Sequence, residues 1–157
     1  MKTHPVMSAV LALSLLHPAA ALGQQAAAPA YTPGLVEFMA FVQIRHAKLW
    51  LAGNAGNWEL ADYEIDEMKE ALENSAKYVP DYKGSPVGKM IETMAMPPIG
   101  EAEQAIKAKD RIKFTAAFDK LTAACNTCHQ AANRPFIVIQ RPVSSAFPNQ
   151  SFAPRRN

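Results

Sequence analysis

Two cysteines and a histidine stand together late in the sequence, with a spacing that carries specific chemistry. They form a C-x-x-C-H pentapeptide, which consists of Cys125, Asn126, Thr127, Cys128 and His129. This pattern is the attachment signature of a c-type haem. On a helix, the two-residue gap lets both thiols reach one edge of a porphyrin and add across its two vinyl groups, while the adjacent imidazole binds the iron. We therefore predict one covalent haem c, with thioether bonds at Cys125 and Cys128 and with His129 as the proximal iron ligand.

The composition describes one globular domain and excludes one class of partner. A length of 157 residues is typical of a single domain, and 49% hydrophobic with 19% charged residues is typical of a folded chain. The 16 basic and 14 acidic side chains nearly balance, so the formal net charge is only +2. We therefore expect no binding of nucleic acid, which requires a basic surface.

The first 23 residues have the pattern of a secretory signal peptide. Lys2 and His4 give a short basic start, an apolar run follows over residues 6–16, and Ala21 and Gly23 are the small residues that a signal peptidase reads. The apolar run is shorter than the ~20 residues that a membrane-spanning helix needs. We expect cleavage after Gly23, a periplasmic protein and no membrane span after cleavage, with an uncleaved N-terminal anchor as the alternative.

Cleavage of the signal leaves two histidines and two cysteines in the chain. Two of the four histidines lie in the signal, so His46 and His129 remain, and both cysteines belong to the pentapeptide. Export places the chain in an oxidising compartment, where an unused C-x-x-C pair closes on itself as a strained disulfide. Attachment of haem uses both thiols and avoids that outcome.

The hydrophobic pattern predicts an all-α fold: an antiparallel four-helix bundle with an irregular C-terminal tail. Thr32 is expected to cap the first helix, with Pro33 at its first position. Asn57 is expected to cap the second helix. Pro97-Pro98 is expected to interrupt the third, leaving two short pieces with a kink or a break between them. The expected segments are a flexible leader at 24–31, helices at 32–52, 58–79, 86–95 with 99–109, and 110–134, a haem domain spanning 32–134, and a tail at 135–157.

The fourth helix is expected to begin at an Asp110 cap and to bury one stripe of side chains. The stripe consists of Phe114, Phe118, Leu121, Cys125 and Cys128, which recur at helical spacing. Both thiols are therefore expected on the inner face of the bundle, with His129 at its edge. The tail contains three prolines and no partner for a strand, and we expect it to drape over the bundle through Phe136, Phe147 and Phe152.

Four amphipathic helices with C-x-x-C-H late in the fourth, behind a signal peptide, resemble the cytochrome c-prime family of class II c-type cytochromes. The resemblance covers residues 32–134 and implies a four-helix bundle with haem held among the helices, usually in the periplasm. In that family the sixth iron position is either empty, and binds small gases, or filled by a methionine early in helix one, for electron transfer. This chain departs from the family at Asn133, where a basic residue is usual, and in the 28 residues that follow His129.

Met39 and His46 are the two candidates for the far side of the iron. Aligning the start of the first helix with the end of the fourth places Met39 about 3 Å, and His46 about 13 Å, along the bundle axis from the level of His129. Imidazole is nevertheless a good haem ligand, so His46 stays a candidate for ligation or for the distal pocket. Met39 as a core methionine, and His46 as a core histidine with one hydrogen bond, are the structural alternatives.

Other kinds of site fit the residues less well. The pentapeptide and His46 together offer the four ligands of a structural zinc, but adjacent Cys128 and His129 rarely both reach one small ion. A thioredoxin-like redox pair expects a βαβ context that the pattern lacks. A structural exported bundle with an unused C-x-x-C is the plainest alternative.

The sequence therefore predicts an exported mono-haem c-type cytochrome that transfers electrons, with redox proteins as partners. The alternative is binding or sensing of a small gas, NO or CO, at a five-coordinate iron. No arrangement of bases and nucleophiles supports an enzyme, and a homodimer is compatible with either function.

Overall fold

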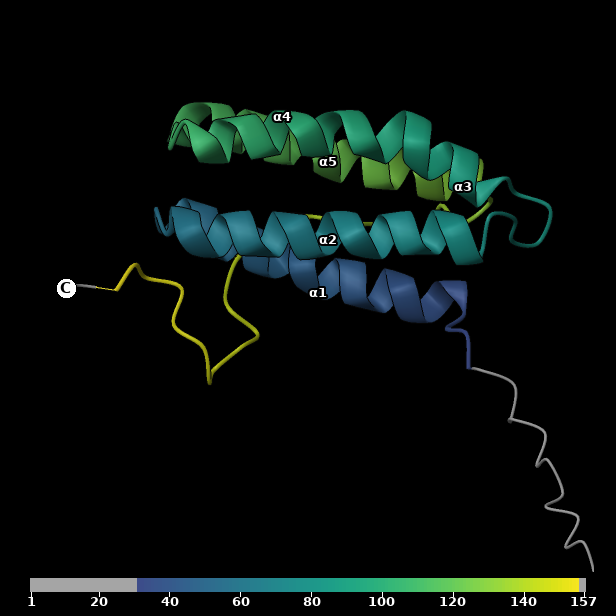
Figure 1. Ribbon diagram of the computed structural model, residues 1–157, viewed down its shortest axis with the longest axis horizontal. Helices are drawn as coiled ribbons and strands as arrows, with labels where there is room; N and C mark the ends of the chain where they lie inside the picture. The colour runs from purple at the N-terminus through teal and green to yellow at the C-terminus, as the bar shows by residue number, and fades with distance from the viewer. Residues whose placement is uncertain (1–30, 156–157) are drawn as a thin grey trace, which may run out of the picture. The chain divides into compact units, whose positions relative to one another are not determined.

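The computed structural model describes residues 31–155. The predicted signal peptide, and the predicted leader except for Tyr31, lie outside the described residues. Within that range the fold is all-α, as predicted: four long helices pack as an antiparallel bundle and an irregular tail follows them (Figure 1). The helical elements are α1 (Leu35–Asn54), α2 (Trp58–Tyr78), α3 (Val87–Met90), the π-helical turn η1 (Ile91–Ala95), α4 (Met96–Lys107) and α5 (Arg111–Ala131).

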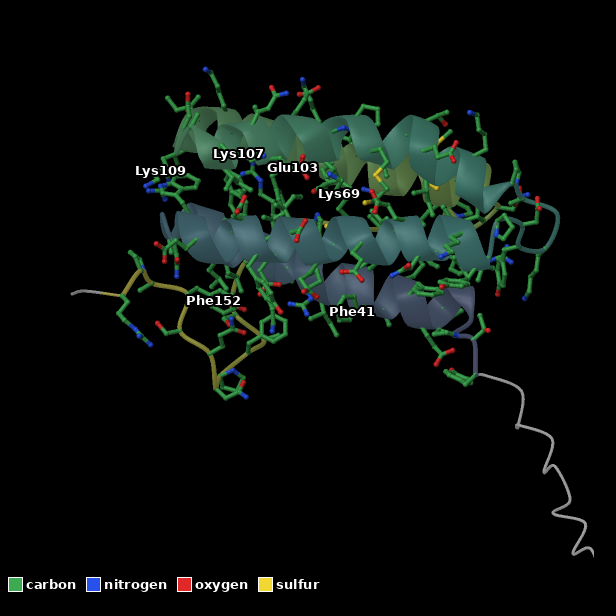
Figure 2. The ribbon with its side chains drawn as sticks, in the orientation of Figure 1. Phe41, Lys69, Glu103, Lys107, Lys109 and Phe152 are labelled. Carbon is green, nitrogen blue, oxygen red and sulfur yellow. The ribbon has the colours of Figure 1, made fainter. Side chains whose placement is uncertain are left out.

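The bundle consists of two helical hairpins that lie against each other. α1 packs along α2 and α4 along α5, and the hairpins meet where α2 contacts α4 and α1 contacts α5 (Figure 1). An ion pair of 3.0 Å between Lys69 of α2 and Glu103 of α4 crosses one of these seams (Figure 2). In the described part of the chain, no helix is both long and apolar enough to cross a membrane.

Three of the four long helices begin at a residue whose contacts explain the start. The Asn57 side chain accepts a hydrogen bond from a backbone N–H of α2, and Asp110 accepts two from α5, so both predicted caps are confirmed. The predicted Thr32 cap is wrong, because α1 begins at Leu35 after Gly34. The Glu37 carboxylate accepts the Gly34 N–H at 2.8 Å, which satisfies that donor and fixes the later start.

Of the kink or break predicted at Pro97-Pro98, the break is wrong. The chain stays helical from Val87 to Lys107, and one turn, η1, is widened into a π-helix. There the Met96 N–H donates to the Ile91 carbonyl five residues earlier. Both prolines then fall in the first turn of α4. They lack an N–H and cannot donate to the carbonyls of Thr93 and Met94 four residues earlier, and these two residues belong to the widened turn η1.

An aromatic cluster fills the core where α1 meets α5. Phe114 and Phe118 are fully buried, and the indole of Trp50 lies 5.0 Å from the ring of Phe118, measured between centroids. Leu121, one turn further along α5, is fully buried as well. The predicted stripe on α5 is thus confirmed as far as Leu121, and its two cysteines continue it as partly buried side chains.

The C-terminal tail turns back from the end of α5 and runs over the bundle. Phe147 lies against Lys48 of α1, and the Asn57 amide donates to the carbonyl of Ala153. Phe152 packs against the core (Figure 2). The predicted draping is confirmed for Phe147 and Phe152 but is wrong for Phe136, which is 76% exposed.

The closest approach of α1 to α5 requires a glycine. A Cβ atom at Gly53 would lie 2.2 Å from the fully buried Phe114 ring, whereas a Cβ at Gly100 of α4 meets nothing within 4 Å. We expect Gly53→Ala to lower the free energy of unfolding by about 1–3 kcal/mol through overpacking. Gly100→Ala, the matched control, is expected to raise it by about 0.5–1 kcal/mol, because alanine favours a helix. Urea unfolding of both variants checks this, and a Gly53→Ala protein at least as stable as the parent would contradict it.

Candidate functional site

The pentapeptide occupies the last two turns of α5. The Asp110 cap fixes where this helix starts, and the buried Phe114, Phe118 and Leu121 fix which face of it points inward. Cys125 and Cys128 consequently lie one turn apart on a half-buried face, and both are free thiols. The local structure therefore presents the two thiols side by side, as the spacing predicted.

Burial keeps both thiols protonated at neutral pH. It raises the pKa of Cys125 to about 11, with a smaller contribution from neighbouring Cys128, and it also raises the pKa of Cys128. Redox-active C-x-x-C pairs have the opposite property, because their function requires a cysteine of lowered pKa. The surroundings of these cysteines thus oppose a thioredoxin-like function.

The imidazole of His129 has one nitrogen engaged and one available. Its Nδ1 lies 3.1 Å from the backbone carbonyl oxygen of Ile137 in the tail. A carbonyl oxygen only accepts hydrogen bonds, so Nδ1 carries the hydrogen and Nε2 presents its lone pair. This is the usual state of a metal-binding histidine, which donates its second ring N–H to a carboxylate or a backbone carbonyl.

Asn126 is a site residue that sequence reasoning missed. Its side-chain amide donates to the carbonyl of Ile139 at 2.9 Å, and its carbonyl oxygen accepts the Ile139 N–H at 2.7 Å. The Asn126 side chain therefore engages both backbone groups of Ile139, its N–H and its carbonyl. The C-x-x-C-H pattern accepts any residue at position 126. No periodic pattern links this position to a residue 13 places later in an irregular segment.

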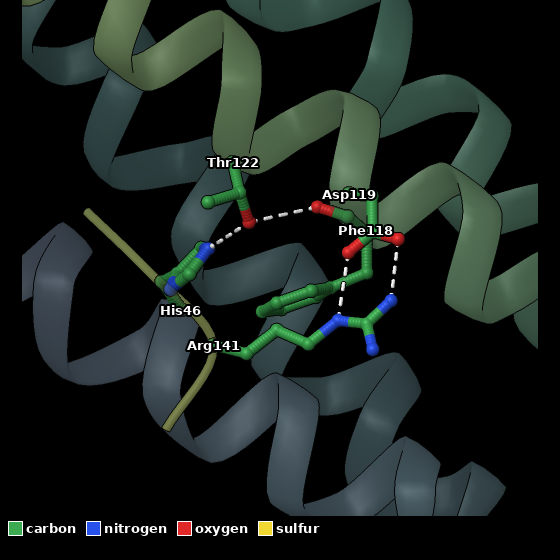
Figure 3. Close-up of polar contacts among 5 residues, drawn as sticks. All are labelled: His46, Phe118, Asp119, Thr122 and Arg141. Carbon is green, nitrogen blue, oxygen red and sulfur yellow. Dashed lines mark hydrogen bonds and ion pairs between the residues drawn. The ribbon is translucent and has the colours of Figure 1, made fainter. Parts of the chain in front are cut away.

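His46 is buried between α1 and α5 and has a structural hydrogen bond. Its Nε2 lies 2.9 Å from the hydroxyl of Thr122, which itself donates to the Phe118 carbonyl (Figure 3). The single hydroxyl hydrogen is thereby used, so His46 donates from Nε2. The His46 ring packs on the Phe118 ring with centroids 4.4 Å apart, and burial lowers the pKa of His46 to about 4.

The same contact fixes the register of α1 against α5. His129 follows Thr122 by seven residues, and Met39 precedes His46 by seven, so antiparallel packing brings Met39 to the level of His129. Seven residues at ~1.5 Å each put His46 about 10 Å away along the axis. The register therefore places Met39, rather than His46, level with His129 along the bundle axis.

The surroundings of the pentapeptide fit a haem. The hydrogen bonds and ring contacts that join α1 to α5 within residues 31–155 all lie at His46 or later along α1. Nearer the pentapeptide, Leu35 and Met39 of α1 and Cys125 of α5 are only partly buried at the edge of the core. Two adjacent thiols, an imidazole with a free Nε2 and apolar side chains at the same level are what attachment requires.

Two surface cavities lie elsewhere. One, of about 400 Å³, is lined by residues of η1, α4 and α5 that include Met94, Lys120 and Thr127, on a different face of α5 from the thiols. The other, of about 440 Å³, is lined by acidic side chains of α2 together with Glu103 and Lys107 of α4. The alternative of a zinc site also lacks its ligand set, because no three His, Cys, Asp or Glu side chains of the described chain are grouped to hold a metal ion.

Comparison of the chain with protein-family models, with curated proteins and with solved structures found no match. The class of protein is therefore argued from the fold and from the geometry of the site alone.

Buried His46 makes stability depend on pH. Its folded-state pKa of about 4 lies below the ordinary 6.5, so the unfolded chain binds the proton more readily between these values. Stability is then full above pH 6.5 and falls as the pH drops towards 4, by roughly 3 kcal/mol. His46→Gln keeps a donor for Thr122 and does not titrate, so its unfolding free energy, measured by urea at several pH values, should fall less over this interval. An unfolding free energy that depends equally on pH in the parent and in His46→Gln would refute the lowered pKa of His46.

Proposed function

We propose that the protein is an exported mono-haem c-type cytochrome that transfers electrons to and from redox partner proteins. The observation that carries this proposal is the state of the pentapeptide on α5. Cys125 and Cys128 lie one turn apart on a half-buried face, and the Ile137 carbonyl holds His129 with its Nε2 free to bind iron. Covalent haem supplies one-electron exchange between ferric and ferrous iron.

The protein's own residues would hold and shield this group. The two thiols would anchor the haem and His129 would bind its iron. The level of His129 on α1 is occupied by Met39 and its partly buried neighbour Leu35. A thioether with a histidine is the ligand pair of electron-transferring cytochromes c. We therefore assign the sixth position to Met39, and this favours electron transfer over the binding of a small gas.

Export belongs to the same proposal. The signal-like segment of residues 1–23 and an oxidising compartment agree with a chain whose only two cysteines form the attachment pair. We place the protein in the periplasm, where a small carrier meets its redox partners by diffusion.

An absorption spectrum and an intact mass of the purified reduced protein test the attachment. We expect the added mass of one haem that denaturation does not remove, together with narrow low-spin bands that carbon monoxide leaves unchanged. Cys125→Ser and Cys128→Ser are each expected to lose one thioether bond, and the double variant to lose covalent haem. A parent protein without covalent haem would contradict the proposal. A high-spin spectrum altered by carbon monoxide would favour the gas-binding alternative.

The assignment of the sixth ligand has its own test. Met39→Ala should convert the low-spin spectrum to a high-spin one that responds to carbon monoxide, because it removes the thioether level with His129. His46→Gln and Met96→Ala are controls: the first alters the other candidate, and the second removes another partly buried methionine from the edge of the core. A low-spin spectrum retained in Met39→Ala would show that another group binds the iron.

A further inference from the structure

The irregular segment after α5 is attached to the haem-attachment motif at two adjacent points. Asn126 exchanges two hydrogen bonds with Ile139, and His129 donates to Ile137, so the backbone of residues 137–139 lies along the last turns of the helix. We call residues 137–141 the strap. Its first contact falls on the proximal imidazole itself.

The side chains of residues 136–138 do little to hold this part of the chain on α5. Ile137 is 42% exposed, and its neighbours Phe136 and Val138 are 76% and 70% exposed. Little apolar surface is therefore removed from water when residues 136–138 lie on α5. Ile137 itself donates its N–H to the Arg134 carbonyl at 3.0 Å, which holds one side of this residue. The two hydrogen bonds between Asn126 and Ile139 hold the chain on the other side, two residues further on.

Arg141 ties the far end of the strap to both helices. Its guanidinium forms an ion pair with Asp119 of α5 (Figure 3). The same group lies 4.4 Å over the Trp50 ring of α1. This contact is separate from Asn126, and it lies about 15 Å along α5 from His129 at ~1.5 Å per residue. The two attachments can therefore be removed one at a time.

We propose that Asn126 is a positioning residue that acts through the strap to hold the Ile137 carbonyl on Nδ1 of His129. This inference rests on the proposed function, because it concerns the iron ligand. A backbone carbonyl that accepts from one ring nitrogen makes the other nitrogen a stronger donor and fixes the orientation of the ring. Stronger donation stabilises ferric over ferrous iron, so the strap lowers the reduction potential.

The experiment compares the haem-loaded parent with Asn126→Ala and measures two quantities. Hydrogen exchange of the Ile139 amide should be faster in Asn126→Ala, because the amide loses its acceptor. The reduction potential should be higher, because the Ile137 carbonyl is no longer held on His129. Thr127→Ala is the matched control: the neighbouring residue is exposed, and its hydroxyl bonds only within α5, to the Ala123 carbonyl. It should leave both quantities unchanged.

Arg141→Ala separates the hydrogen bond from simple coverage of the motif. It frees the far end of the strap but leaves both bonds of Asn126, so its potential should lie closer to that of the parent than the potential of Asn126→Ala does. Equal shifts in the two variants, or an unchanged potential in haem-loaded Asn126→Ala, would overturn the inference. Covalent haem is measured first in every sample, so a parent without haem counts against the proposed function, whereas a haem-loaded variant with the parent's potential counts against the positioning role alone.

Discussion

The packing of α1 against α5 is the constraint on which the rest of the site depends. Phe114 lies where Gly53 leaves room for its ring. About two turns away along both helices, His46 meets Thr122. These contacts set the register of two helices that are far apart in sequence. The register in turn decides which residue of α1 stands level with His129, and so which sixth ligand the proposed function assigns.

His46 shows how a core solves the problem of a polar side chain. A buried donor without a partner costs about 1–3 kcal/mol, and a buried charge costs more. The Thr122 hydroxyl accepts one hydrogen bond from the imidazole and donates one to the Phe118 carbonyl. Burial keeps the ring neutral. The residue that looked most like a metal ligand by type is thus engaged in packing, and the less conspicuous Met39 lies at the level of the His129 imidazole.

Sequence reasoning succeeded where the cause of a structure is local. The caps at Asn57 and Asp110, the inner stripe of α5 and the pairing of two thiols on one turn all follow from residue type and helical spacing. It failed where a distant or cooperative contact decides. The later start of α1 is an exception, because the bond from the Gly34 N–H to Glu37 spans only three residues and follows a local capping pattern. The bond between Asn126 and Ile139, by contrast, joins a helix to a segment without periodicity. No pattern of hydrophobic residues carries information about such a pair.

The π-helical turn η1 also corrects the direction in which buried side chains point around the helix axis. Val87, Ile91, Ala95 and Ile99 are all buried, and they follow one another in three successive steps of four residues. On a regular α-helix those steps would carry the buried side around the axis by about 120°, since each residue turns the chain by about 100°. One extra residue in a single turn absorbs most of that drift. The segment from Val87 to Lys107 thereby works as one continuous helix that keeps one side buried, although its sequence does not repeat at 3.6 residues.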